Sequence, residues 1–105
     1  MKILANGNSE SDKLQKLYDI ADEMVDLLEK DRISQVELWD CSIYPPIPEI
    51  GIIKIRVEGD WKHDLLRSKY LITQNFNIIK SETESLEDTG SDWGPELQSY
   101  YIYLD

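Results

Sequence analysis

The side chains that could form a cysteine nucleophile and its general base occur once each, at Cys41 and His63. They are 22 positions apart and could meet in a fold, but a lone cysteine in a strand is more often a buried, inert side chain. One cysteine and one histidine also cannot form an internal disulfide or supply the four ligands of a structural zinc site. We therefore expect no catalysis from Cys41, and a surface or helix-capping contact for His63.

A short acidic segment, Asp88-Thr-Gly-Ser-Asp92-Trp-Gly94, superficially resembles a calcium-binding loop. An EF-hand loop needs oxygen ligands at its first, third and fifth positions and glycine at its sixth. Here the third position is Gly90 and the sixth is Trp93, so we expect no metal site. The chain also lacks nucleotide-binding and nucleophile-elbow motifs, and nothing selects two carboxylates for acid–base work. The sequence thus favours a protein that is not an enzyme and has no cofactor.

Acidic side chains dominate the composition, with 21 Asp and Glu against 11 Lys and Arg, for a net charge of −10 over 105 residues. Residues 81–105 hold seven acids and no base, and residues 10–31 form a second acidic cluster. Such a surface repels phosphates and anionic lipids and attracts basic protein surfaces. We therefore expect a basic protein partner and no direct contact with nucleic acid or membrane. The alternative, that the acidity only keeps the protein dissolved, stays open.

Aromatic residues accompany the acids near the end of the sequence. Trp93 lies in a polar, glycine-flanked loop, and exposed aromatic residues among charges are typical of protein-recognition sites. Alternatively, Trp93 folds back onto the sheet. Tyr101 and Tyr103, on one face of the final strand, extend the same suggestion. The predicted partner-binding residues are the carboxylates of the two acidic regions together with this tryptophan: Glu82, Glu84, Glu87, Asp88, Asp92, Trp93, Asp19, Asp22 and Asp26.

Two helices must position these groups. An apolar residue on every third or fourth position predicts a helix over 9–30, with Ser9 or Ser11 capping its start. A second helix is predicted over about 61–73, with Asp60 as its N-cap.

Four strands are also predicted. The apolar face of the first strand changes near Asp40, which indicates a bulge or bend. Trp39 and Trp61 fit core positions. Three prolines after Tyr44 form a stiff loop that is either a connector or a polyproline-type ligand. The predicted strands cover 33–44, 51–58, 76–85 and 97–104.

The fold class predicted from this order is α+β, α-β-β-α-β-β, as one domain over 1–105. Short connections favour a four-stranded, mainly antiparallel sheet with two helices packed on one face. A parallel crossover between the second and third strands is the alternative. The chain has no run of eighteen apolar residues and its start lacks a secretory pattern, so we expect a cytoplasmic protein.

Two segments, Gly59-Asp60-Trp61-Lys62-His63-Asp64 and Gly90-Ser91-Asp92-Trp93, resemble blocks in small acidic proteins of phages and mobile elements of Gram-positive bacteria. The resemblance spans roughly residues 51–104 and implies no particular activity. The group's pattern has a second histidine after the His-Asp pair, where this chain has Leu65, and this departure weakens a ligand role for His63. By type rather than by motif, the chain also resembles an anti-CRISPR.

Three functions are compatible with these features. The first is an inhibitor, most plausibly an anti-CRISPR, whose carboxylates occupy the basic nucleic-acid or PAM-reading surface of a type II CRISPR effector nuclease. The second is a small metal-dependent enzyme that uses Asp60, His63, Asp64 and Asp92. The third is an accessory or assembly subunit of a mobile element that dimerises through its last strand. Either a monomer or a homodimer is compatible with the first function, which would place the protein in the host cell.

Overall fold

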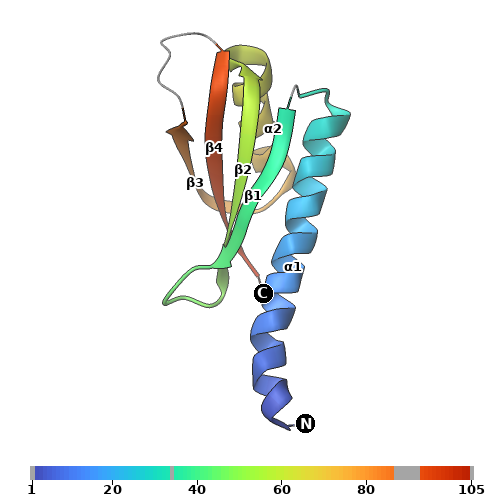
Figure 1. The fold of residues 1–105 in the computed structure, drawn as a ribbon, viewed down its shortest axis with the longest axis vertical. Coiled ribbons are helices and arrows are strands. Elements are labelled where there is room, and N and C mark those ends of the chain that lie inside the picture. The colour runs from blue at the N-terminus through green and yellow to red at the C-terminus, as the bar shows by residue number, and fades with distance from the viewer. Residues whose placement is uncertain (1, 34, 87–92, 105) are drawn as a thin grey trace.

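The computed structural model describes residues 2–33, 35–86 and 93–104. Its elements confirm the predicted α-β-β-α-β-β order and the α+β class (Figure 1). In chain order they are α1 (Lys2–Lys30), β1 (Gln35–Ile43), β2 (Ile50–Asp60), the π-helical turn η1 (Trp61–Leu65), α2 (Leu66–Asn75), β3 (Ile78–Ser85) and β4 (Trp93–Tyr103).

The four strands form one sheet in the order β1-β2-β4-β3, and every neighbouring pair is antiparallel. The predicted antiparallel sheet is therefore confirmed. Strands β2 and β3 are not neighbours, because β4 lies between them and pairs with both. Both edges of β4 are thus occupied, so the expected dimerisation by pairing through the last strand has no free edge to use.

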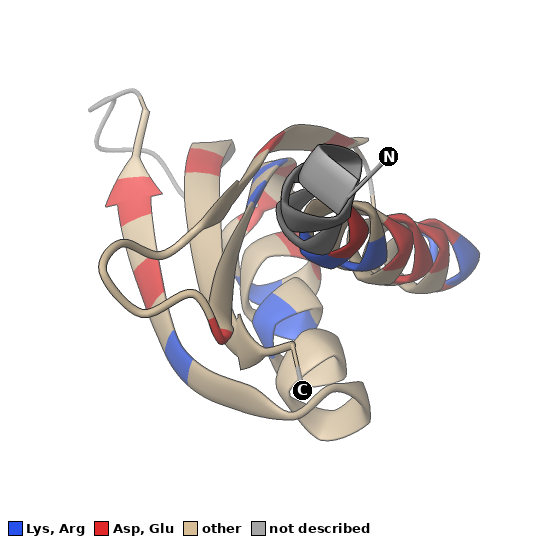
Figure 2. Cartoon of the chain, turned by 90° about the horizontal axis from the view of Figure 1, so that it is seen from below, with Lys and Arg blue, Asp and Glu red and all other residues tan. Residues whose placement is uncertain are grey.

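Both helices cover the same face of the sheet, as predicted (Figures 1 and 2). On α1, Leu17, Ala21, Met24 and Leu28 have no exposed surface, which places the predicted apolar stripe in the core. The alternate residues Ile53, Ile55 and Val57 of β2 are equally buried. No helix of the described residues covers the other face of the sheet, which is called here the open face.

Helix α1 begins at Lys2 instead of residue 9, so neither Ser9 nor Ser11 is its N-cap. Serine favours a cap position but is also tolerated inside a helix, and a cap signal therefore does not by itself start one. As a result the N-terminal part of α1 runs past the end of the sheet (Figure 1).

The predicted irregularity in β1 is confirmed as a register shift between Leu38 and Asp40. Trp39 is the extra residue, and the shift lets both Leu38 and Cys41 lie opposite buried residues of β2. Trp39 itself is 51% exposed, so its expected place in the core is wrong. The bulge places the small thiol of Cys41 in the core and leaves the large indole at the surface.

Candidate functional site

The outward face of α1 carries five exposed carboxylates, called here the acidic ridge: Asp19, Asp22, Glu23, Asp26 and Glu29. At about 100° per residue these positions fall within about a third of the helix circumference, opposite the buried stripe. No Lys or Arg lies between Leu17 and Glu29. Figure 2 marks the acidic positions along the ribbon of α1 in red. The structure thus brings the predicted Asp19, Asp22 and Asp26 together and adds two neighbours.

Two lysines that precede the acidic ridge on α1 contact backbone carbonyls of other segments. Lys13 Nζ lies 3.4 Å from the carbonyl oxygen of Pro48, and Lys16 Nζ donates to the carbonyl oxygen of Leu104. These contacts hold α1 against the β1–β2 loop and the residue that follows β4. Both ammonium groups are therefore directed toward the fold and not toward the acidic ridge.

The predicted Glu82 and Glu84 lie on β3, opposite Ser99 and Leu97 of β4. Tyr101 donates a hydrogen bond of 2.7 Å to Glu82 Oε1, and Lys80 Nζ lies 3.5 Å from the other oxygen. The hydrogen bond from Tyr101 and the charge of Lys80 lower the pKa of Glu82. Glu82 already has partners within the chain.

The two predicted acidic groups are on opposite faces of the sheet. Ser99 and Leu97 alternate with the buried Gln98 on β4, so the side chains of Glu82 and Glu84 belong to the open face. The acidic ridge lies on the helix side, and β3 is at the edge of the sheet farthest from β1. Glu87, Asp88 and Asp92 lie outside the described residues. Trp93 begins β4, where its backbone pairs with Asp60, and its side chain is likewise not described.

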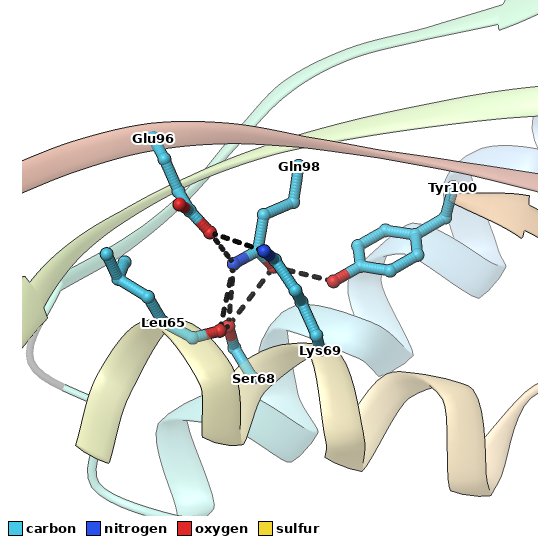
Figure 3. A network of polar contacts seen from close by, with 6 residues as sticks. All are labelled: Leu65, Ser68, Lys69, Glu96, Gln98 and Tyr100. Atoms are coloured by element: carbon cyan, nitrogen blue, oxygen red, sulfur yellow. Dashed lines mark hydrogen bonds and ion pairs between the residues drawn. The ribbon is translucent and has the colours of Figure 1, made fainter. Parts of the chain in front are cut away.

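Glu96 belongs to the acid-rich final segment but is only 7% exposed. Its Oε1 lies 3.4 Å from Lys69 Nζ of α2 and accepts a hydrogen bond of 2.7 Å from Gln98 Nε2 (Figure 3). The Glu96 carboxylate therefore links α2 to β4 and is not part of the surface available to a partner.

Gln98 is the centre of a buried polar network that the sequence pattern did not predict (Figure 3). Its Nε2 donates to Ser68 Oγ at 2.9 Å and lies 3.2 Å from the carbonyl oxygen of Leu65, while its Oε1 accepts from the Tyr100 hydroxyl at 2.6 Å. Gln98, Ser68 and Tyr100 are at most 1% exposed. The alternation of β4, extended backward from Tyr100, is the signal that could have placed Gln98 and Glu96 on the buried face.

The Gly59–Asp64 motif builds the start of η1. Asp60 Oδ1 accepts hydrogen bonds of 2.9 Å from the backbone amides of Lys62 and His63, which confirms the predicted N-cap. The side chain of His63 is exposed. The carboxylate Oδ2 of the buried Asp64 accepts a hydrogen bond of 2.7 Å from the Asp60 backbone amide. A Cβ on Gly59 would lie 2.2 Å from that same oxygen, so only glycine fits. Backbone amides thus engage Asp60 and Asp64, two of the three carboxylates expected at the metal-dependent site. The third, Asp92, lies outside the described residues.

The single thiol is in the core. Cys41 is 6% exposed, and burial, assisted by the charges of Asp40 and Asp22, raises its pKa to about 12. Its buried position agrees with the prediction, and both burial and the raised pKa disfavour the nucleophilic thiolate at neutral pH.

The outward face of η1 and α2 carries three exposed apolar side chains, called here the α2 stripe: Trp61, Leu66 and Tyr70. Their exposed fractions are 47%, 40% and 56%. The core position expected for Trp61 is therefore wrong. A residue at the first position of a helix can face outward even where its type favours burial, because here Leu65 and Ser68 provide the contact with the sheet.

Comparison with protein families, curated proteins and solved structures finds no match for this chain. Within residues 2–33, 35–86 and 93–104, no three metal-ligating side chains come together, and no helix has the length and apolar character needed to cross a bilayer.

Proposed function

We propose that this protein is an inhibitor that places the acidic ridge of α1 in the basic nucleic-acid-binding surface of a nucleic-acid-processing enzyme. The observation that carries the proposal is the continuity of negative charge along the ridge. The ridge has five carboxylates over residues 19–29, and an α-helix rises about 1.5 Å per residue, so the negative charges are spaced about 3–4 Å apart along the helix axis. The phosphate charges of one DNA strand have a similar spacing of about 3.4 Å.

A carboxylate and a phosphate make similar contacts with arginine and lysine. Arginine in particular binds either group through two parallel hydrogen bonds, so a surface built for a phosphate backbone also accepts a row of carboxylates. The ridge residues are exposed, and in the described part of the chain only Asp19 among them has a polar partner, a hydrogen bond of 3.1 Å from Gln15 Nε2. Their association with a basic channel would require little rearrangement within this protein.

The proposed target is a type II CRISPR effector nuclease, which acts in the cytoplasm of the host cell. Small size, strong acidity and the resemblance of residues 51–104 to phage and mobile-element proteins support this choice. Glu82 and Glu84 of β3 would form a secondary contact, since their side chains belong to the open face and the acidic ridge does not.

Charge reversal on the acidic ridge tests the proposal. We expect Asp22→Lys with Asp26→Lys to weaken inhibition of nuclease cleavage by at least about tenfold, because like charges then face each other across the contact. Glu37→Lys with Glu49→Lys makes the same change of net charge on exposed residues elsewhere and should leave inhibition intact. Equal inhibition by both variants, or capture of no nucleic-acid-binding enzyme from host lysate, would contradict the proposal.

A further inference from the structure

The α2 stripe is an outward apolar surface in a small and highly charged chain. Leu66 lies one π turn after Trp61, and Tyr70 lies one α turn after Leu66, so the three side chains follow one line. Ser68 and Ile72, which face the sheet, are fully buried on the other side of the same helix. Exposed tryptophan and tyrosine side chains of this kind are enriched at the centres of protein interfaces.

The charges around the α2 stripe differ in sign from those of the rest of the chain. Residues 61–75 contain three bases, Lys62, Arg67 and Lys69, and one acid, Asp64, which is 1% exposed. The Arg67 guanidinium lies 5.8 Å from the centre of the Tyr70 ring. Arg67 and Lys69 also offset Asp31 and Glu96 beside them. The stripe is thus a surface on which a negatively charged partner meets no net repulsion.

The acidic ridge and the α2 stripe are adjacent. Helices α1 and α2 lie side by side on one face of the sheet, joined by the ion pair of Arg67 Nε and Asp31 Oδ2 at 2.8 Å (Figure 1). Each molecule therefore presents a negative ridge next to an apolar stripe bordered by bases. A two-fold axis parallel to the helices, between two such molecules, sets α1 of each copy against α2 of the other.

We propose that this protein forms a two-fold homodimer through its helix layer, in which the acidic ridge of each copy binds the α2 stripe of the other. Charge complementarity selects a second copy as the occupant. The ridge supplies acids, and Lys62 has no ion pair among the described residues, while Arg67 and Lys69 keep their pairs with Asp31 and Glu96. The same two-fold axis relates the two ridge–stripe contacts, so the assembly is a closed dimer and does not extend into a filament.

The dimer hides the acidic ridge from any other partner. Self-association and target binding would therefore exclude each other, and dilution would release the ridge. The dimer itself does not depend on the proposed function, because it is measured on the protein alone.

Sedimentation velocity over a concentration series is the first test. We expect a monomer–dimer equilibrium that shifts toward monomer in about 1 M salt, where the Debye length falls to about 3 Å. Leu66→Ser with Tyr70→Ser, both exposed positions, should raise the dimer dissociation constant by roughly tenfold or more. Only monomer at every concentration of the unmodified protein would overturn the inference.

A pair of reciprocal variants tests which surfaces meet. Asp22→Lys with Asp26→Lys places lysines against Lys62 of the second copy, and Lys62→Glu places a glutamate against the ridge. Each variant alone should dimerise less than the unmodified chain, and an equimolar mixture should recover the dimer, because both contacts are then complementary.

Glu37→Lys with Glu49→Lys is the matched control and should dimerise like the unmodified chain. If the ridge variant dimerises normally while Leu66→Ser with Tyr70→Ser does not, the stripe pairs with itself and the proposed contact is wrong. Circular dichroism of each variant checks that the fold is kept.

Discussion

Two consecutive tyrosines of β4 place the same chemical group on the two faces of the sheet. The Tyr100 hydroxyl donates 2.6 Å to Gln98 Oε1 beneath α2, and the Tyr101 hydroxyl donates 2.7 Å to Glu82 Oε1 on the open face. Burial, together with the charge of Glu96, raises the pKa of Tyr100, whereas the hydrogen bond to Glu82 is the main cause that raises the pKa of Tyr101. Two bonds of nearly equal length thus differ mainly in their access to water.

The comparison indicates that the polar groups of this fold have separate roles. A buried hydrogen bond that is lost leaves a group with no water to replace the partner, and the protein loses stability. On the open face water replaces the lost partner, so the same change affects the pKa and the surface but hardly the fold. Stability should therefore depend on the network under α2, and recognition on exposed carboxylates and aromatic residues.

Removal of Gln98 should have the largest effect that separates the two faces. Gln98→Ala opens a cavity, leaves the buried Tyr100 hydroxyl without its partner and removes one hydrogen-bond partner each from Ser68 and Glu96. We therefore expect a loss of about 3 kcal/mol or more in the free energy of unfolding. Glu82→Ala on the open face is the matched change and should leave the unfolding midpoint in urea unchanged. Equal midpoints for the two variants would show that the network contributes nothing to stability.

The two tyrosines provide a smaller and more conservative comparison. Tyr100→Phe removes only the hydroxyl from the network and should lower the free energy of unfolding by about 1–2 kcal/mol. Tyr101→Phe should lower the free energy of unfolding by only a few tenths of the Tyr100→Phe loss, because water then solvates Glu82. The Lys80 ammonium, 5.2 Å from the centre of the Tyr101 ring in the native chain, can keep its contact with the ring. Urea denaturation of both variants measures the difference, and a larger loss from Tyr101→Phe would reverse the comparison.

Alkaline pH should destabilise the fold through the helix-covered face. The pKa of Cys41 rises from 9.0 when exposed to about 12 in the fold, so its contribution is complete below pH 9 and is lost as the pH rises toward 12. The raised pKa of Tyr100 acts in the same direction from pH 10 upward. Thermal unfolding followed between pH 8 and pH 10 should show a decline that is smaller in Cys41→Ala.

A decline of equal slope in Cys41→Ala would mean that the thiol is not the group responsible. A thiol reagent added to the folded protein at neutral pH offers an independent check, since we expect reaction only after unfolding. Rapid labelling without loss of circular dichroism would contradict the buried position of Cys41.

Hydrophobic periodicity was enough to predict most of the fold. The apolar stripe of α1 and the alternation of β2 each fix which face of the element is buried, because a shift of either element by one residue would expose its apolar side chains. The position of β4 between β2 and β3 could not be predicted in the same way, since the two neighbours of a central strand are chosen by contacts between distant segments. The start of α1 at Lys2 shows that a cap signal is weaker evidence than a periodic stripe.

The candidate site was predicted only in part. Charge counting identified Asp19, Asp22 and Asp26, but it cannot distinguish an exposed acid from the buried, paired Glu96. Trp39 and Trp61 were predicted to be buried because of their residue type. Both are exposed, Trp39 because it lies at the bulge of β1 and Trp61 because it occupies the first helical position. Local geometry, which depends on which neighbour covers which side chain, therefore decided the outcome at each of these residues.

The central place of β4 has a consequence for synthesis of the protein on the ribosome. Strands β2 and β3 emerge before the strand that joins them, so neither can complete its hydrogen bonds until residues 93–103 have been translated. The α1, β1 and β2 segment can assemble early, while β3 waits with its polar side chains in solvent. The serines, threonine and charged residues of β3 would keep this waiting strand from pairing with the wrong chain.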